Sequence, residues 1–99
     1  MQITDIRIRL LNSEGRLKAF VSVTFDDCFV VHDMKIIEKP ERLFVAMPSR
    51  PKPSPGEFAD VAHPINKETR EWLEQAILDE YIKLMSTVDS TVSAEEDGQ

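Results

Sequence analysis

Four residues have the types and spacing that come nearest to a metal site or a nucleophilic pair. Cys28, His32 and Asp33 lie close together, and His63 lies much further along. A structural zinc site usually needs four protein ligands, often including paired cysteines, and this chain has a single cysteine. Strand alternation also predicts that His32 and Asp33 point to opposite faces. We therefore expect no metal site, no cofactor and no Cys–His nucleophile, and the chain is predicted not to be an enzyme.

The ordinary interpretation of these residues is structural. We expect Cys28 to be half-buried near a turn, and both histidines to be held by hydrogen bonds.

Two cations on a proline-rich segment are better candidates for a functional role. Residues 48–56 read PSRPKPSPG, and four prolines in this stretch exclude a helix and a central strand. We expect a stiff, extended, exposed loop that carries Arg50 and Lys52 with Ser49 beside them. Arginine and serine suit phosphate, and a stiff loop loses little entropy on binding. The alternative is that both charges are simply solvated.

The charges separate a body from an acidic tail. The 99 residues carry 12 Lys and Arg and 18 Asp and Glu, which gives a net charge of −6. Residues 1–85 contain all 12 cations and 14 of the acids, a balance of −2, and residues 86–99 contain the other four acids. We predict one folded domain over 1–85 and a disordered acidic tail over 86–99. General basic charge is absent, so any nucleic-acid contact requires a local basic cluster.

The cysteine content and the hydropathy pattern bear on the compartment. One cysteine cannot form an internal disulfide framework, which indicates a reducing environment. No stretch approaches the ~20 apolar residues of a membrane span, and the N-terminus lacks the basic region of a signal peptide. We expect a cytoplasmic protein with no membrane partner.

Hydrophobic periodicity predicts the elements that must position these residues. Alternating or β-branched runs indicate four strands, at residues 3–11, 17–25, 29–38 and 43–47, and a brief fifth at 58–62. Short connections favour an antiparallel meander. Apolar residues at helical spacing predict a helix over 67–85, with Asn66 as its N-cap. The predicted class is α+β: an antiparallel sheet meander of four to five strands followed by one C-terminal amphipathic helix.

One helix is too narrow to cover such a sheet. A helix is ~10 Å across and four strands span roughly 19 Å, so the helix covers about two strands of one face. The second and third strands carry apolar residues on both faces, such as Val21 on one and Phe20 on the other. We expect a second copy of the chain to cover the open face, by sheet packing or by joining edge strands, which predicts a homodimer.

Several segments together resemble the SpoVG family, the stage V sporulation or septation proteins. The segments are residues 3–7 (ITDIR), 15–19 (GRLKA), 29–34 (FVVHDM), 43–49 (LFVAMPS) and 56–66 (GEFADVAHPIN). The helix is also similar, and the resemblance extends over residues 1–85. It implies a small bacterial cytoplasmic homodimer with a β-sheet and a C-terminal helix. It also implies a regulator of processes such as septation and sporulation that binds DNA, and in some members RNA, with no small-molecule substrate.

The resemblance also implies where nucleic acid would bind. Family binding is tied to basic residues in the loop after Met-Pro-Ser and around the helix, which carries over to Arg50 and Lys52, with Ser49 beside them and Arg70 on the helix. The family loop usually has adjacent basic residues and a later arginine. Here a proline separates the pair, and Ala59 stands at the later position. The alternative function, favoured by the acidic charge balance, is a protein-interaction module that binds no nucleic acid directly.

Overall fold

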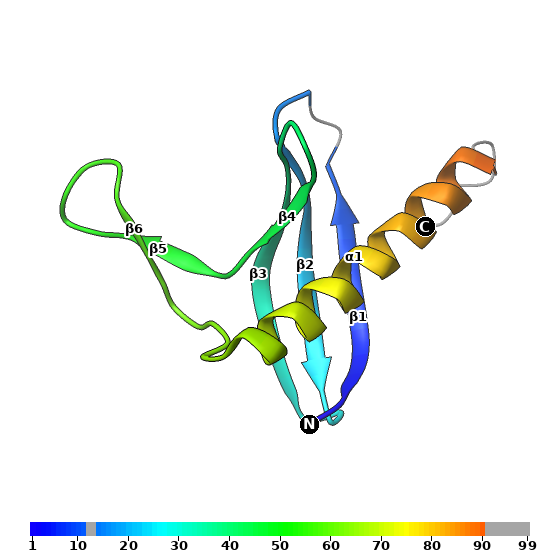
Figure 1. Cartoon of the computed structure of the whole chain (residues 1–99), viewed down its shortest axis with the longest axis horizontal. Coiled ribbons are helices and arrows are strands. Elements are labelled where there is room, and N and C mark those ends of the chain that lie inside the picture. Colours follow the sequence, from blue (N-terminus) through cyan, green and yellow to red (C-terminus); the bar gives the residue numbers. More distant parts are fainter. Residues whose placement is uncertain (12–13, 91–99) are drawn as a thin grey trace.

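The computed structural model describes residues 1–11 and 14–90, and it contains one main sheet, one small sheet and one helix (Figure 1). The main sheet is antiparallel, with the strands in sequence order. Its strands are β1 (Ile3–Leu10), β2 (Leu17–Phe25), β3 (Phe29–Glu38) and β4 (Leu43–Ala46). A hairpin of β5 (Ser49–Pro51) and β6 (Phe58–Asp60) follows, and the helix α1 (Lys67–Ser90) comes last. The predicted α+β class is confirmed, although the brief fifth strand lies in the separate small sheet.

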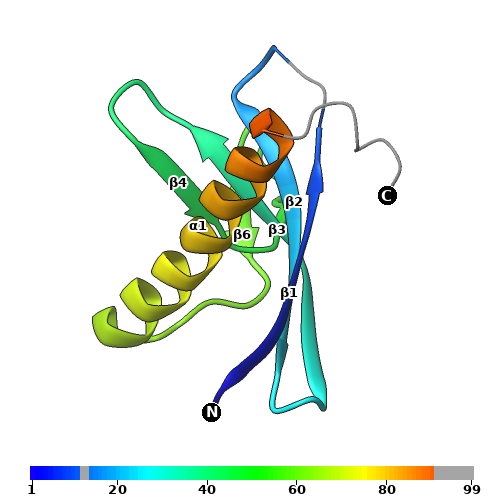
Figure 2. The same cartoon turned by 90° about the vertical axis from the view of Figure 1, so that its right-hand side faces the viewer.

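The helix covers one face of the main sheet, and no other described element covers the opposite face (Figure 2). The buried core is the interface between α1 and the covered face. Leu73, Ile77 and Tyr81 supply the helix side, spaced four residues apart as an apolar stripe requires. The sheet side and its margin consist of Ala19, Val21, Val23, Phe25, Met34, Ile36, Val45 and Met47.

Both ends of α1 can be compared with the sequence expectation. Asn66 caps the helix, because its Oδ1 accepts a hydrogen bond from the Thr69 backbone N–H at 2.8 Å. The helix ends at Ser90, five residues beyond the predicted end at residue 85. Neither glycine nor proline interrupts those five residues, so the backbone can continue. The remainder of the predicted tail lies outside the described residues. No helix in the described part of the chain has the length and apolar character needed to span a membrane.

A tight turn joins β2 to β3. Asp26 and Asp27 adopt left-handed φ values of 52° and 56°, and the Cys28 N–H donates to the Phe25 carbonyl at 3.0 Å. Positive φ at both central residues is the type I′ turn pattern, whose twist suits antiparallel strands, although the register pairs Phe25 with Phe29 and so leaves three residues between them. Cys28 is exposed at this turn, so the expectation that it is half-buried was wrong. The turn extends past the end of the helix-covered core, so little packs against the thiol.

A bulge in β3 interrupts the expected alternation of side chains. Val21 of β2 pairs with Met34 and Val23 pairs with Val31, so His32 and Asp33 both lie opposite Ser22. Asp33 has a φ of 69°, which only a distorted strand position allows. Both residues line the same groove on the uncovered face, so strict alternation does not separate them as predicted. Both histidines are hydrogen-bonded as expected, His32 to Ser22 at 2.8 Å and His63 to the Pro64 carbonyl at 2.9 Å.

Two isoleucines on α1 test the importance of the covered face. Ile77 is fully buried, whereas Ile82 is 53% exposed on the same helix. Ile77→Ala should lower the free energy of unfolding by about 2–5 kcal/mol, because it removes buried methyl groups and leaves a cavity. The matched Ile82→Ala change should cost well under 1 kcal/mol. Urea unfolding followed by circular dichroism measures both, and equal losses would contradict the assigned helix orientation.

Candidate nucleic-acid interface

The hairpin of β5 and β6, with the turn between them, forms an arm (residues 49–60) that projects away from the main sheet (Figure 1). Its base is fixed by the buried Met47 and Pro48, and the Val61 N–H donates to the Pro48 carbonyl at 2.7 Å. Beyond this base only Ala59 is partly buried. The radius of gyration of 14.6 Å exceeds the ~13 Å typical of a compact chain of this length, to which both the arm and the long helix contribute.

The arm is a paired hairpin, whereas the sequence predicted a stiff, extended loop without pairing; the expected exposure and extended backbone are present at Ser49–Pro51. The Lys52 N–H donates to the Glu57 carbonyl at 2.8 Å, and the Glu57 N–H donates to the Ser54 carbonyl at 3.2 Å. Pro55 and Gly56 occupy the middle of this turn, and Gly56 has a φ of 81°. This is the proline–glycine pattern of a type II turn. The prolines do not prevent pairing here, because a two-stranded sheet consists only of edges.

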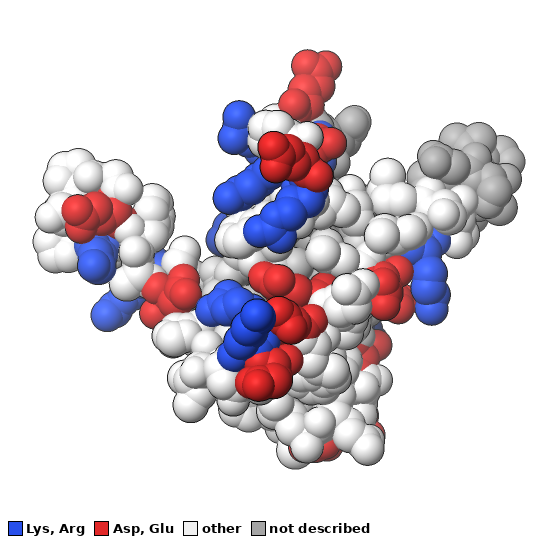
Figure 3. Space-filling view, in the orientation of Figure 1, with Lys and Arg blue, Asp and Glu red and all other residues white. Residues whose placement is uncertain are grey.

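Two of the predicted site residues extend into solvent from this arm. Arg50 and Lys52 are exposed, and neither forms an ion pair with any described residue. Blue surface marks the arm in Figure 3, with red surface beside it. The arm also contains Glu57 and Asp60, so its formal charge is zero. Its cations are therefore available for local contacts, but the arm alone has no long-range positive field.

The other two predicted residues differ in their positions. Ser49 is exposed on β5, one residue from Arg50, so the structure brings these side chains together with Lys52. Arg70 lies in the first turns of α1 and is half-buried. The base of the arm and the start of α1 lie on the same side of the sheet in Figure 1. Among the described residues, Arg70 forms no ion pair with the arm.

Sequence reasoning missed a second group of cations, on the uncovered face of the main sheet. Arg9 and Lys35 lie over the ring of Phe20, at 5.2 and 5.9 Å from its centroid. Lys39 and Arg42 lie over the ring of Phe44, at 4.4 and 6.0 Å. Alternation alone places Arg9 on this face, but the partners depend on the register between strands. The bulge in β3 is a feature of that register, and no residue pattern revealed it.

These cations bear on the prediction that a second copy of the chain covers this face. The sequence predicted that Phe20 and its neighbours need a second copy to cover them. In the structure Phe20 and Phe44 are partly buried, and an arginine and a lysine lie over each ring. The uncovered face therefore combines apolar residues with cations, which weakens the argument for burying it against another purely apolar surface.

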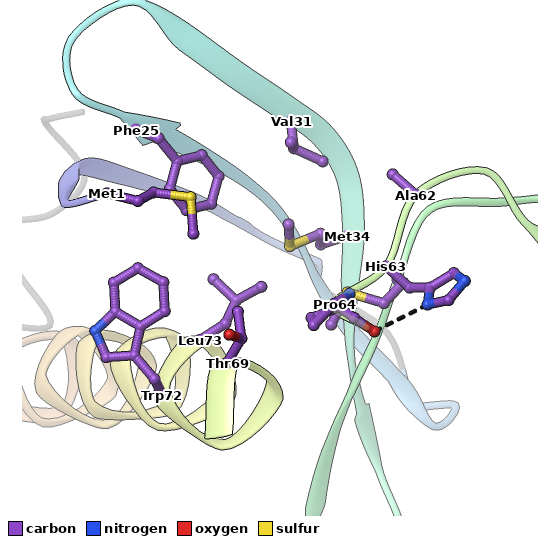
Figure 4. Close-up of a pocket in the computed structure, with 11 residues that line it drawn as sticks. Met1, Phe25, Val31, Met34, Ala62, His63, Pro64, Thr69, Trp72 and Leu73 are labelled. Atoms are coloured by element: carbon purple, nitrogen blue, oxygen red, sulfur yellow. Dashed lines mark hydrogen bonds between the residues drawn. The ribbon is translucent and has the colours of Figure 1, made fainter. Parts of the chain in front are cut away.

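An apolar pocket lies between the start of α1 and the end of the sheet near the β2–β3 turn (Figure 4). Met1, Phe25 and Trp72 converge on it, and the rings of Phe25 and Trp72 are 6.4 Å apart. Large exposed apolar side chains are concentrated near this end and on the arm. They are Met1, Phe29, Val30, Phe58, Val61, Ile65 and Trp72, while Ile82, also exposed, lies further along α1.

The fold and the arm define a small α+β protein that presents exposed cations on a projecting hairpin. Comparison with known families identifies the family: the SpoVG family model matches residues 1–83, so this chain belongs to the SpoVG family.

Similar proteins carry the name "Putative septation protein SpoVG". The one from Caldicellulosiruptor bescii is 59% identical over 86 residues, which cover 87% of this chain and 97% of that protein. The one from Caldanaerobacter subterraneus subsp. tengcongensis is 64% identical over 83 residues, covering 84% and 90%. The one from Clostridium novyi is 56% identical over 96 residues, covering 97% and 95%. The similarity to these relatives therefore includes the sheet, the arm and most of the helix.

Gly56 tests whether the turn holds the arm in shape. Gly56→Ala places a side chain at a left-handed position, which costs roughly 1–2 kcal/mol. The Lys52 amide should then exchange with solvent about five to thirty times faster, because its hydrogen bond to Glu57 breaks more often. Hydrogen exchange by NMR measures this. Ser54→Ala, in the same turn, is the control, and unchanged exchange in Gly56→Ala would contradict the assigned turn.

Proposed function

We propose that this chain is a nucleic-acid-binding regulatory protein that contacts DNA, and also RNA, through its arm. The observation that supports this most is the pair of exposed cations, Arg50 and Lys52, on a hairpin held by backbone hydrogen bonds. Because the arm is ordered before binding, less conformational entropy is lost when it meets a phosphate backbone. Ser49 adds a hydroxyl beside Arg50, and Arg70 is the further contact from α1.

The biological setting follows from the relatives. Several proteins more than half identical to this chain are named septation proteins. We propose that this chain acts in the same setting, in the cytoplasm, by influencing cell septation, sporulation or gene expression. Its role is regulatory binding and not catalysis.

We propose further that two copies of the chain associate. The exposed apolar side chains near the pocket and on the arm support this, because such a concentration is costly in water for an isolated monomer. A twofold dimer would present two arms, and thus four arm cations, to one nucleic acid. This proposal replaces the uncovered sheet face with the apolar end and the arm as the surface of association.

A protein-interaction module remains the second candidate function. The apolar pocket beside Trp72 favours it, because an aromatic or aliphatic side chain from another protein would fit among its lining residues. On this alternative the arm cations are solvated and bind no nucleic acid.

Removing the arm cations should weaken nucleic-acid binding. Arg50→Ala combined with Lys52→Ala should reduce affinity for a labelled DNA duplex. It should also flatten the salt dependence by about 0.9 in log–log slope per lost phosphate contact, or about 1.8 per chain. Fluorescence anisotropy at several salt concentrations measures both quantities. Lys67→Ala combined with Lys83→Ala removes the same charge from α1, where each lysine faces a glutamate, and is the control. Equal effects of the two pairs would remove the arm from the site.

The proposed dimer has its own test. Phe58 is 65% exposed on the arm, and Phe58→Ser should shift the chain towards monomer in sedimentation velocity at micromolar concentration. Ile82→Ser changes an exposed apolar residue elsewhere, on the helix, and should leave the assembly unchanged. A wild-type chain that is entirely monomeric under these conditions would overturn the dimer proposal.

A further inference from the structure

The uncovered face of the main sheet carries an ordered row of side chains across all four strands. Arg9 of β1 lies opposite Phe20 of β2, Phe20 lies opposite Lys35 of β3, and Lys35 lies opposite Ala46 of β4. Residues directly opposite one another share a face, so these four side chains form one line across the sheet. Adjacent strands are about 4.8 Å apart, so the Cα atoms of Arg9 and Lys35 are roughly 10 Å apart, on either side of Phe20.

A second aromatic residue extends this row towards the edge of the sheet. Phe44 of β4 pairs with Ile37 of β3, two residues along from the Lys35–Ala46 pair. Lys39 and Arg42, from the connection between β3 and β4, lie over its ring. Each ring therefore holds two cations, and the four cations extend from β1 to the β3–β4 connection.

The face has more positive than negative charge, although the chain as a whole is acidic. Arg7 and Lys18 join the four cations, which makes six positive residues on this face and its margin. The acids beside them are Asp5, Asp33, Glu38 and Glu41, a balance of +2. By contrast, residues 67–87 of α1 contain three cations and five acids, a balance of −2. The uncovered face is thus the cationic side of the molecule.

Beside the row lies a polar groove lined by Arg7, Arg9, Phe20, Ser22, His32 and Asp33. The β3 bulge builds it, because two residues of β3 lie opposite Ser22 there. Asp33 has a left-handed φ of 69°, a conformation that costs free energy at a residue other than glycine. The groove offers hydrogen-bond donors and acceptors next to Arg9, which suits the edge of an unpaired base.

We propose that the uncovered face of the main sheet is a second binding surface, which takes a single-stranded nucleic acid. The phosphates lie along Arg9, Lys35, Lys39 and Arg42, and an unpaired base stacks on the guanidinium plane of Arg9, which Phe20 supports from below. Stacking on arginine and aromatic groups requires bases that are free of a duplex, so the face should prefer single strands. Charge complementarity and aromatic support favour nucleic acid over an apolar partner. The inference rests on the proposed nucleic-acid function.

The test uses the full chain and labelled single-stranded oligonucleotides, DNA and RNA, of about 30 nucleotides. Arg9→Gln combined with Lys35→Gln should weaken single-strand binding about tenfold or more and flatten its salt dependence. Arg9→Lys keeps the charge but loses the flat guanidinium, so it should lose affinity for single strands with little change in salt dependence. The control is Lys67→Ala with Lys83→Ala, and urea unfolding checks that each variant is folded.

Three results distinguish the outcomes. Loss of single-strand binding in the sheet-face variants, with the control near wild type, supports the second surface. Normal binding in folded sheet-face variants, with loss only in Arg50→Ala and Lys52→Ala, overturns this inference and leaves the arm proposal intact. If the wild-type chain binds neither single strands nor duplex at low salt, the proposed function and this inference fail together.

Discussion

One amphipathic helix covers one face of a four-stranded sheet, and the other features of the molecule follow from this constraint. Burial of Leu73, Ile77 and Tyr81 against the sheet supplies the core of the domain. The same helix cannot reach the second face, and the chain provides no other described element to cover it. Within the described part of the chain, every residue of the arm except Ala59 is exposed. Two surfaces are therefore left free to meet partners.

On the face of the main sheet that α1 does not cover, cationic side chains lie over two aromatic rings. Phe20 and Phe44 provide strand-forming, partly buried side chains, and an arginine and a lysine lie over each ring. The same contacts restrict the motion of the cations, so under the proposed function less entropy would be lost on binding a phosphate. These contacts thus hold the cations in defined positions on the sheet. In the arm, backbone hydrogen bonds and a proline–glycine turn hold Arg50 and Lys52 in a similar way.

Much of this fold can be predicted from the sequence, because local patterns determine it. Alternating apolar residues predicted the four strands of the meander. Helical spacing predicted the apolar face of α1 that packs on the sheet, and Asn66 predicted where α1 begins. The features that escaped prediction depend on pairing between distant residues. The bulge at Asp33 exists only in the register of β2 with β3, and the arm forms because residues 49–51 find partners at 58–60. The predicted cations of the arm were located by residue type and resemblance. The cations of the sheet face required knowledge of which strands are neighbours.

The central claim is that nucleic acid meets the surfaces that the helix leaves free. The most direct measurement is NMR of the arginine side-chain Nε–H groups while a single-stranded oligonucleotide is added. The account predicts that the resonances of Arg9 and Arg42 on the sheet face and Arg50 on the arm shift together as binding saturates. Saturable binding that leaves these three resonances unchanged, with shifts confined to residues around the apolar pocket, would contradict it.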